Sequence, residues 1–202
     1  MNMIPVQEFE RALDAACAML QVPGAVLLIP TETVYGLVCR WDDAAAREKI
    51  YTLKERDGRK PLAMFAASPA ALERAGVVLD GNPRRLLECF TPGPITIIAS
   101  NRDGSTTGFR IPDHPFVKAL LKRCGVPLAS TSANHSGSPN ALSVTEALSE
   151  LAGEADLVID AGAIPPDSRA STVVDVSKTG SWRILRQGPV TEEAVRTALM
   201  RA

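Results

Sequence analysis

The chain has 202 residues, of which 46% are hydrophobic and 22% are charged. This composition is typical of a globular protein, and the length predicts one domain over residues 1–202. Because 22 Lys and Arg residues face 23 Asp and Glu residues, the net charge is −1, which excludes a polycation that binds nucleic acid through overall charge. Without a long apolar run or a leader pattern in residues 1–24, we expect a soluble cytoplasmic protein with no membrane association.

The cysteines and histidines exclude common metal and redox motifs. The four cysteines lie 22, 50 and 35 residues apart, at Cys17, Cys39, Cys89 and Cys124. This spacing excludes a close-pair zinc or redox motif and predicts buried, reduced thiols. His114 and His135 are the only histidines, so no metal site is predicted. Any catalysis must then rely on lysine, arginine, hydroxyl, amide and carboxylate side chains.

The first third of the chain alternates helices with short apolar runs. Hydrophobic residues recur at helical spacing over residues 6–20, which predicts an amphipathic helix. A Pro-Gly pair ends this helix, and the apolar run 25–29 is typical of a buried strand. Asp42 or Asp43 is expected to cap the next helix, which leads toward a second apolar run at 61–66.

The remainder of the chain continues this alternation. Later helices are expected to begin at five residues with N-cap or first-turn character, namely Ser68, Asn82, Asp113, Ser143 and Thr191. Strand-like runs lie at 95–99, 107–111, 126–130, 157–160, 171–176 and 182–186. About eight strands and about six helices predict an α/β fold. Two pairs of consecutive strands leave no room for a crossover helix, so we expect a mixed parallel and antiparallel sheet.

Polar segments follow several predicted strands, where open α/β sheets place ligands. These segments are 30–36, 54–60, 110–114 and 130–140. The last is rich in Ser, Asn and Gly, so it could wrap a phosphate or ribose with many weak donors, or form an ordinary turn. Lys54 and Arg56 could neutralise a polyphosphate, or lie in a solvated charged loop. Arg110 should face either solvent or a carboxylate or phosphate partner.

Several standard mechanisms lack their motifs. The sequence has no G-x-x-x-x-G-K-S/T loop, no G-x-G-x-x-G fingerprint and no G-x-S-x-G elbow. A Ser-His-Asp arrangement has only weak candidates, because one histidine precedes proline and the other lies in a predicted loop. Nucleotidyl transfer suits the remaining residues, since positioning and charge neutralisation do most of the work in that reaction.

Seven segments, taken in order, resemble the YrdC-like family of threonylcarbamoyl-AMP synthases. They are PTETVYGL at 30–37, the Lys54 and Arg56 pair before Pro61, PGPIT at 92–96, FRIPDHP at 109–115, SAN at 132–134 with its Ser-Gly and Pro, STVVD at 171–175 and ILRQG at 184–188. Together these motifs span residues 22–190. The resemblance implies a twisted mixed sheet with flanking helices around a basic cavity, in the family's short, single-domain form.

The resemblance also implies a reaction and its partners. L-threonine, bicarbonate or CO2 and ATP, with Mg2+, would give threonylcarbamoyl-AMP and pyrophosphate. A tRNA-modifying transferase complex would then move the threonylcarbamoyl group to N6 of adenosine at position 37 of tRNA. No metal ligands from the protein are expected. The reaction needs no enzyme nucleophile, because an amine and CO2 form a carbamate whose oxygen can attack the α-phosphate.

The resemblance assigns roles to individual residues. Lys54 and Arg56 match a catalytic pair that binds the ATP phosphates and the carbamate. Further nucleotide-binding positions correspond to Ser132, Asn134, Asn140 and Arg186. Positions around threonine correspond to Thr31, Tyr35, Arg110 and Ser171, and Arg110 could pair with the threonine carboxylate.

The sequence departs from the family pattern at four positions. Phe65 stands where several relatives have histidine, and Ala170 replaces a common glutamate; Asp57 and Thr91 also differ. The first two lie on the amino-acid side, so one alternative is a paralogue that activates another amino acid or carbamate. A second alternative is a non-catalytic RNA-binding protein of the same fold. A carbamoyl-phosphate-using maturation factor shares the fold, but its relatives carry further modules.

Overall fold

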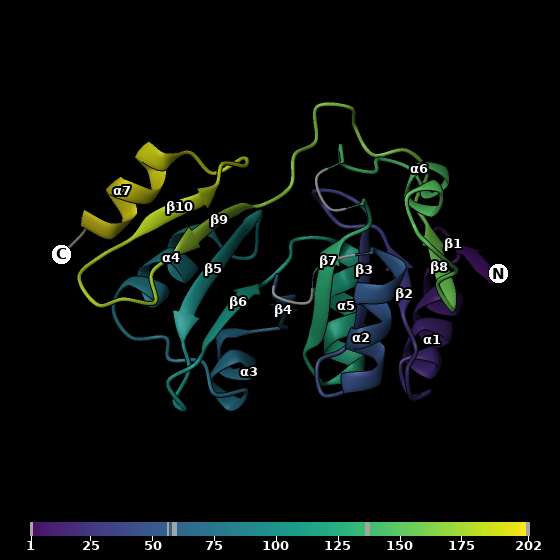
Figure 1. Ribbon diagram of the computed structural model, residues 1–202, viewed down its shortest axis with the longest axis horizontal. Coiled ribbons are helices and arrows are strands. Elements are labelled where there is room, and N and C mark those ends of the chain that lie inside the picture. The colour runs from purple at the N-terminus through teal and green to yellow at the C-terminus, as the bar shows by residue number, and fades with distance from the viewer. Residues whose placement is uncertain (1, 56, 58–59, 136–137, 201–202) are drawn as a thin grey trace.

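The computed structural model describes residues 2–55, 57, 60–135 and 138–200, which form one ten-stranded sheet flanked by seven helices (Figure 1). The strands are β1 (Met3–Pro5), β2 (Leu27–Ile29), β3 (Gly36–Arg40), β4 (Ala63–Phe65), β5 (Ile95–Ser100), β6 (Thr106–Arg110), β7 (Leu128–Ser132), β8 (Leu157–Asp160), β9 (Thr172–Asp175) and β10 (Arg183–Arg186). The helices are α1 (Phe9–Met19), α2 (Ala44–Leu53), α3 (Pro69–Arg74), α4 (Asn82–Phe90), α5 (Pro115–Cys124), α6 (Val144–Ser149) and α7 (Glu192–Met200).

The sheet is mixed, as predicted, with the strand order β1-β8-β2-β3-β7-β4-β6-β5-β9-β10. The consecutive strands β5 and β6 pair antiparallel, and so do β9 and β10. Crossovers produce the parallel pairings, for example between β4 and β6 and between β5 and β9. Both features follow from the connection lengths, because a short loop permits only antiparallel pairing.

Two strands lie outside the predicted set, and two predicted helix starts are displaced by one residue. β1 has only three residues, which are too few to show a periodic pattern in the sequence. β3 directly follows the polar turn and begins with four apolar residues in a row. Periodicity alone does not show whether such a short apolar run is a strand or a helix. Gly81 and His114, rather than Asn82 and Asp113, precede α4 and α5, which carry proline in the first turn. The caps at Asp43, Ser68 and Ser143 are confirmed by side-chain hydrogen bonds to backbone N–H groups.

Three hydrophobic clusters divide the molecule into two halves that share the sheet. In the half that contains β1, β2, β3, β7 and β8, α1 and α5 pack against one side of the strands and α2 and α6 against the other. In the other half, α3, α4 and α7 pack around β5, β6 and β9 (Figure 1). The opposite side of these strands faces a cavity, so the two halves meet around an internal space.

Strand alternation explains how the same strands build both core and cavity. In β5, Ile95 and Ile97 are buried in the hydrophobic cluster, whereas Thr96 and Ile98 line the cavity. Phe109 of β6 likewise joins the cluster, and the next residue, Arg110, lines the cavity. Successive side chains of a strand point to opposite faces, so an apolar residue and a cation can be neighbours in the chain.

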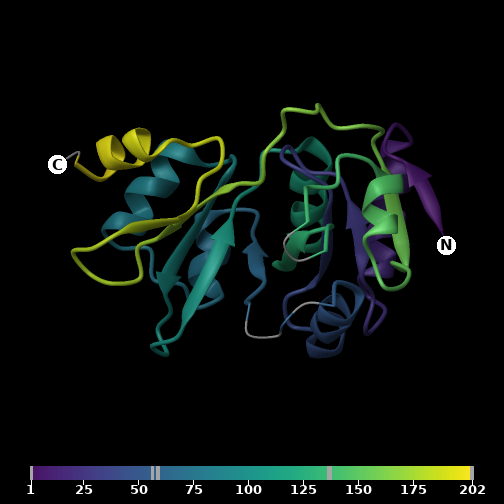
Figure 2. The ribbon, with the colours of Figure 1, turned by 45° about the horizontal axis from the view of Figure 1, so that its top comes forward.

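The segment between β8 and β9, residues 161–171, crosses from one half of the molecule to the other (Figure 2). Tyr35 holds the start of this segment, because its hydroxyl donates to the carbonyl of Gly162 at 2.7 Å and accepts from the N–H of Ala161 at 2.9 Å. The end of the segment brings Ala170 and Ser171 to the cavity wall.

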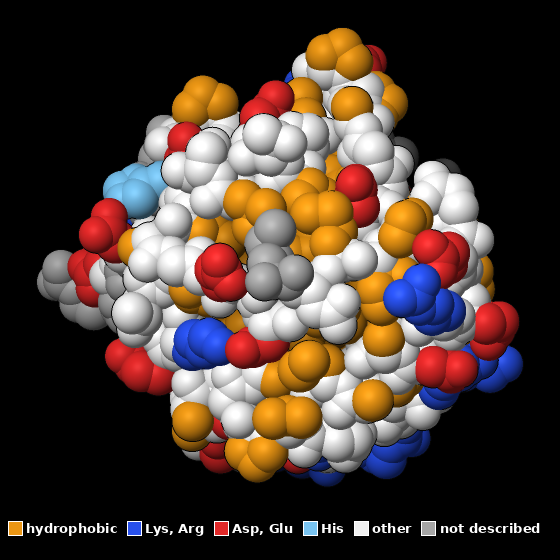
Figure 3. Space-filling model, turned by 90° about the vertical axis from the view of Figure 1, so that its right-hand side faces the viewer, with side chains coloured by type: hydrophobic (Ala, Val, Ile, Leu, Met, Phe, Trp, Pro, Cys, Tyr) orange, Lys and Arg blue, Asp and Glu red, His pale blue; other side chains and the backbone are white. Residues whose placement is uncertain are grey.

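Charges of both signs are interspersed on the face that Figure 3 shows, with hydrophobic side chains between them. This distribution agrees with the near-zero net charge. In the ranges that the structure describes, no helix is both long and apolar enough to cross a membrane.

Candidate functional site

A cavity of about 450 Å³ lies between the two halves of the sheet. Its volume falls within the range of small-molecule sites, roughly 300–1,000 Å³. Of the nine predicted site residues that the structure describes, five line it, and they come from five separate parts of the chain: Thr31, Arg110, Ser132, Ser171 and Arg186. The fold therefore brings predicted amino-acid-side and nucleotide-side residues into one space.

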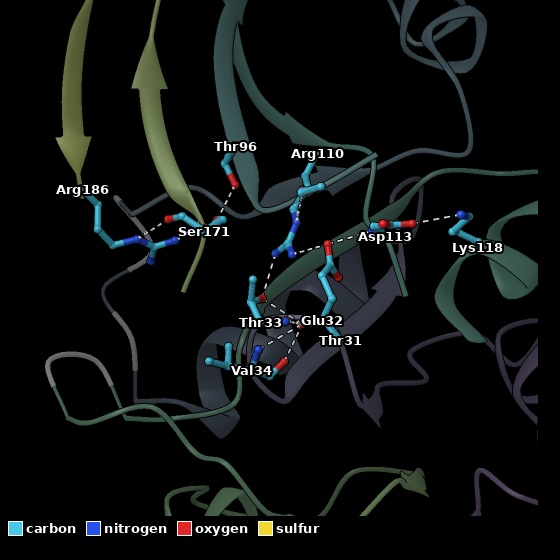
Figure 4. A network of polar contacts seen from close by, with 11 residues as sticks. Thr31, Glu32, Thr33, Val34, Thr96, Arg110, Asp113, Lys118, Ser171 and Arg186 are labelled. Atoms are coloured by element: carbon cyan, nitrogen blue, oxygen red, sulfur yellow. Dashed lines mark hydrogen bonds and ion pairs between the residues drawn. The ribbon is translucent and has the colours of Figure 1, made fainter. Parts of the chain in front are cut away.

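Arg110 is the buried cation of this cavity, with 4% of its surface exposed. Its Nε donates to the carbonyl of Gly93 at 3.1 Å, and its Nη1 donates to Thr33 Oγ1 at 3.0 Å (Figure 4). The guanidinium carbon lies 5.6 Å from the centroid of the Phe65 ring, within the range of a cation–π contact. The guanidinium is thus fixed on three sides.

Glu32 supplies the counter-charge of Arg110. Its Oε1 lies 2.7 Å from Arg110 Nη2 and accepts the N–H of Asp113 at 2.7 Å. Burial lowers the pKa of Arg110, and the charge of Glu32 acts in the opposite direction. Arg110 Nη2 and Glu32 Oε2 are buried without a well-aligned hydrogen bond to any described residue. The ion pair thus retains donor and acceptor capacity, which fits a site that receives a polar ligand group.

Thr31 organises the turn that carries Glu32 and Thr33 into place. Its hydroxyl donates to the carbonyl of Val34 at 2.7 Å and accepts the N–H groups of Thr33 and Val34 at 3.1 and 3.2 Å. Such side-chain to backbone bonds stabilise a turn locally. The polar turn therefore has a defined shape and presents hydroxyl groups to the cavity next to Arg110 (Figure 4).

Ser171 and Arg186 form a second polar group on the cavity wall. Arg186 Nη2 donates to Ser171 Oγ and its Nε to the Ser171 carbonyl, both at 3.0 Å, and Ser171 Oγ lies 2.8 Å from Thr96 Oγ1 (Figure 4). Gly188 follows β10. A Cβ added to Gly188 would lie only 2.3 Å from the carbonyl oxygen of Ala170. Glycine at that position lets the two chain segments approach and hold Arg186 beside Ser171.

Lys54 lies at the end of α2 and is buried, with 1% of its surface exposed. Its Nζ donates to the carbonyl of Ser132 and lies 3.3 Å from Thr131 Oγ1, and both of these residues line the cavity. The predicted cation is therefore anchored at the carboxyl end of β7, directly behind the cavity wall. Its predicted partner Arg56 lies outside the described residues.

Three predicted residues lie apart from the cavity wall. Asn134 donates from Nδ2 to the carbonyl of Ser138 at 2.7 Å, while its buried Oδ1 has no partner among the described residues. Asn140 is partly exposed further along the same stretch. Tyr35 is fully buried, and burial raises the pKa of its hydroxyl to about 12. Its hydroxyl contacts the segment that follows β8, so its position supports the fold around the site.

Sequence reasoning missed several residues of this site. Glu32 lies in a recognised motif, but nothing in the local pattern shows that it pairs with Arg110, 78 residues later. Thr96 and Asp175 also line the cavity, and Asp175 accepts the Ser177 hydroxyl at 2.7 Å. Strand alternation could have placed them on the same face as other cavity residues, but only after the strand order was known.

The described residues include no group of three or more His, Cys, Asp or Glu side chains that could hold a metal ion. The chemistry of the wall instead comes from guanidinium groups, an anchored ammonium group and hydroxyl groups. These groups bind carboxylates and phosphates. Fold and site together define an α/β protein with a cavity at the junction of two half-sheets, lined by arginine and hydroxyl side chains.

Comparison with known proteins narrows this class to a family. A family model named Sua5_yciO_yrdC, described as "Telomere recombination", matches residues 20–188. The threonylcarbamoyl-AMP synthase of Mus musculus is 42% identical over 191 residues, which cover 88% of this chain and 67% of that protein. The synthase of Chromohalobacter salexigens is 35% identical over 183 residues, covering 86% of this chain and 97% of that protein.

A solved structure gives the same result. The crystal structure of P. abyssi Sua5 complexed with L-threonine matches with a TM-score of 0.87 and 27% sequence identity over 99% of this chain. This chain spans 61% of that longer protein. The chain belongs to the Sua5/YciO/YrdC family, so the resemblance noted in the sequence is confirmed.

Proposed function

We propose that this chain is a threonylcarbamoyl-AMP synthase. It would convert L-threonine, bicarbonate or CO2 and ATP into threonylcarbamoyl-AMP and pyrophosphate. The observation that carries the proposal is the shared cavity, in which Arg110 and Arg186 face the same space together with hydroxyl groups from several strands. The names of the mouse and Chromohalobacter relatives, and the threonine complex of P. abyssi Sua5, support it.

The chemistry of the wall suits this reaction. The amine of threonine adds to CO2 and loses a proton to give a carbamate. A carbamate oxygen then attacks the α-phosphorus of ATP, and the bond to the β-phosphate oxygen breaks to release pyrophosphate. Since the substrates supply both nucleophile and leaving group, the protein must align them and stabilise negative charge. Buried arginine and lysine groups with hydroxyl donors can do both.

We assign the residues around the cavity to different substrates. Arg110 would bind the threonine carboxylate beside Thr31 and Ser171, because its Nη2 still lacks a well-aligned partner. Ser132, Asn134 and Arg186 would receive the nucleotide, together with the partly exposed Asn140. Lys54 and Arg56 would act at the phosphates and the carbamate. Tyr35 would act by holding the segment that ends at Ser171.

Mg2+ would enter with ATP rather than through a protein cage. This ion usually keeps several waters and binds substrate phosphates, with one or two carboxylates at most. Among the described residues, the cavity wall contains one carboxylate, Asp175, which is paired with Arg183 at 3.0 Å. The metal's contribution would be to neutralise phosphate charge when bound.

The product would be a mixed anhydride of a carbamic acid and AMP. A separate tRNA-modifying transferase would use it, transferring the threonylcarbamoyl group to N6 of adenosine in tRNA. In this proposal residues 1–202 act as one catalytic unit.

A second candidate is synthesis of a related carbamoyl adenylate from another amino acid. The observation that favours it is Phe65, which is 4% exposed and presents an apolar ring beside Arg110 instead of a polar group. The same cavity would then hold a carboxylate at Arg110 but select a different side chain.

The test is pyrophosphate release from Mg-ATP and bicarbonate with each amino acid in turn. Release that requires both threonine and bicarbonate supports the synthase, and equal release with serine or without amino acid refutes threonine specificity. Salt-dependent tRNA binding without ATP turnover would instead indicate an RNA-binding protein.

Variants connect the activity to the site. We expect Lys54→Ala and Arg56→Ala to abolish pyrophosphate release while thermal unfolding remains cooperative. Lys118→Ala is a matched control, because Lys118 pairs with Asp113 in an ion pair whose side chains are half-exposed. Full activity of both the Lys54 and the Arg56 variant would show that the site assignment is wrong.

A further inference from the structure

Helices α1 and α5 bring two cysteines into contact that are 107 residues apart in the chain. Cys17 Sγ lies 3.2 Å from Cys124 Sγ, within the distance of an S–H···S hydrogen bond. Neither helix contributes to the cavity wall among the described residues. Sequence spacing excluded a close-pair redox motif, but the fold assembles a thiol pair from distant segments. This pair has no role in the proposed reaction.

The two helices are held together by other contacts around the thiols. The rings of Phe9 and Phe116 meet edge to face at 5.9 Å between centroids. Arg123 pairs with Glu10 at 2.8 Å and with Asp14 at 2.5 Å. A disulfide needs its sulfur atoms about 2.05 Å apart, so they would have to approach by about 1.2 Å. Small rotations of two side chains between packed helices can supply such a movement.

Cys17 and Cys124 are both partly exposed, whereas the other two cysteines are more buried or more exposed than this pair. Cys39 is fully buried, and Cys89 is exposed on α4. A dissolved oxidant can therefore reach the pair, and the chain contains its own buried and exposed comparison cysteines. Burial and the neighbouring Cys17 sulfur raise the pKa of Cys124 to about 12. Either sulfur can donate in the contact between the two thiols. Because the raised pKa disfavours the Cys124 thiolate, we assign the first attack to Cys17.

We propose that Cys17 and Cys124 form a modification site at which a hydroperoxide produces a reversible disulfide. The Cys17 thiolate attacks the peroxide oxygen, the O–O bond breaks, and Cys17 becomes a sulfenic acid while the alkoxide or hydroxide takes up a proton. The Cys124 sulfur then attacks the Cys17 sulfur, and the hydroxyl leaves as water with the proton of the Cys124 thiol. Two thiols and one hydroperoxide give one disulfide, one alcohol or water from the peroxide, and one water.

The disulfide would change the stability of the fold. It would close a chain loop of about 107 residues and so restrict the unfolded chain. α1 leads into β2 and the turn at Thr31, and α5 leads into β7 and Ser132, so the bond would tie together the supports of two cavity segments. We expect oxidation to raise the midpoint of thermal unfolding by on the order of 10 °C. We also expect pyrophosphate release, if present in the reduced protein, to persist.

The experiment treats the reduced full chain with a small excess of hydrogen peroxide, followed by alkylation, proteolysis and mass spectrometry. We expect one cross-linked peptide joining residues 17 and 124, lighter than the two free peptides by two hydrogens and lost on adding dithiothreitol. Cys89→Ser and Cys39→Ser should retain this cross-link, and Cys17→Ser should abolish it. In Cys124→Ser, dimedone should label Cys17, because the sulfenic acid has no second thiol to react with.

Two results would overturn the proposal. One is a protein whose Cys17 and Cys124 remain alkylatable after the peroxide treatment that oxidises Cys89. The other is dimedone labelling of Cys124 in Cys17→Ser with none of Cys17 in Cys124→Ser, which would reverse the order of steps. Thermal unfolding of each serine variant under reducing conditions verifies that the helices still pack. The outcome is independent of the proposed function, because no step uses the cavity.

Discussion

Replacing Glu32 by glutamine tests whether this carboxylate balances the buried charge of Arg110. Glutamine has the same shape and can still accept the N–H of Asp113, so the variant removes mainly the negative charge. Arg110 is 4% exposed, and its Nη2 lies 2.7 Å from Glu32 Oε1. In the variant the cation stays buried, and every remaining acceptor around it is neutral: the carbonyl of Gly93, the Thr33 hydroxyl and the amide oxygen of Gln.

Removing one partner of a buried ion pair costs about 3–5 kcal/mol, because the other charge stays desolvated. The Glu32 side chain retains 19% exposure, so solvent screens part of the interaction and the lower end, about 3 kcal/mol, applies. With a urea m-value of about 2 kcal/mol/M, the unfolding midpoint should fall by about 1.5 M. Arg110→Met should also destabilise the protein, because it leaves Glu32 unpaired.

The double variant Glu32→Gln/Arg110→Met should lose less stability than the sum of the single variants, with a coupling of about 2 kcal/mol. The matched control is the exposed pair Glu73 and Arg84, which lie 2.8 Å apart with side chains 41% and 46% exposed. Glu73→Gln should cost less than about 1 kcal/mol. The charge-balance reasoning is wrong if Glu32→Gln costs no more stability than Glu73→Gln. It is also wrong if the stability losses of Glu32→Gln and Arg110→Met add up in the double variant.

Gly188→Ala should lower the free energy of unfolding by about 1–3 kcal/mol and reduce turnover, because the new Cβ would meet the Ala170 carbonyl oxygen at 2.3 Å. Chemical denaturation measures the loss of stability, and pyrophosphate release measures turnover. Gly108→Ala, whose Cβ would make ordinary contacts at 3.5 Å, should cost less stability, and the reverse order would contradict the close-packing argument. Hydrogen bonds from the N–H groups of Ala46 and Gly24 lower the pKa of Asp43 below its usual 3.8. Its stabilising contribution is therefore present above about pH 4 and lost as the pH falls through the lowered pKa. Asp43→Asn should show a weaker fall in urea midpoint between pH 5 and pH 2, and an unchanged fall would refute this role.

The fold class could be predicted from local patterns because the strands and helices here obey ordinary periodicity. Caps such as Asp43 and Ser68 are set by side-chain to backbone bonds within a few residues, so sequence identifies them directly. β1 was missed because three residues carry no period, and its pairing with β8 depends on a strand more than 150 residues later. Whether residues 1–202 are the whole functional unit remains a prediction.

The candidate site was predictable as a set of residues but not as a geometry. The motifs named Arg110, Ser132 and Ser171, and the structure brings them to one cavity. They also named Tyr35, whose hydroxyl is turned toward the segment after β8. A motif records which residues occur together in a family, whereas the direction of each side chain depends on the strand beside it.

By itself, the sequence determined the α/β class, the mixed sheet, the family and the residue types that reaction chemistry requires. Each of these follows from local periodicity, connection length or ordered motifs. The pairing of Glu32 with Arg110 and the contact of Cys17 with Cys124 became known from the three-dimensional structure alone. Both contacts join residues far apart in the chain, and their energies depend on burial and on distances of a few ångströms. Spacing along a sequence does not encode these quantities, because the packing of the whole sheet sets them.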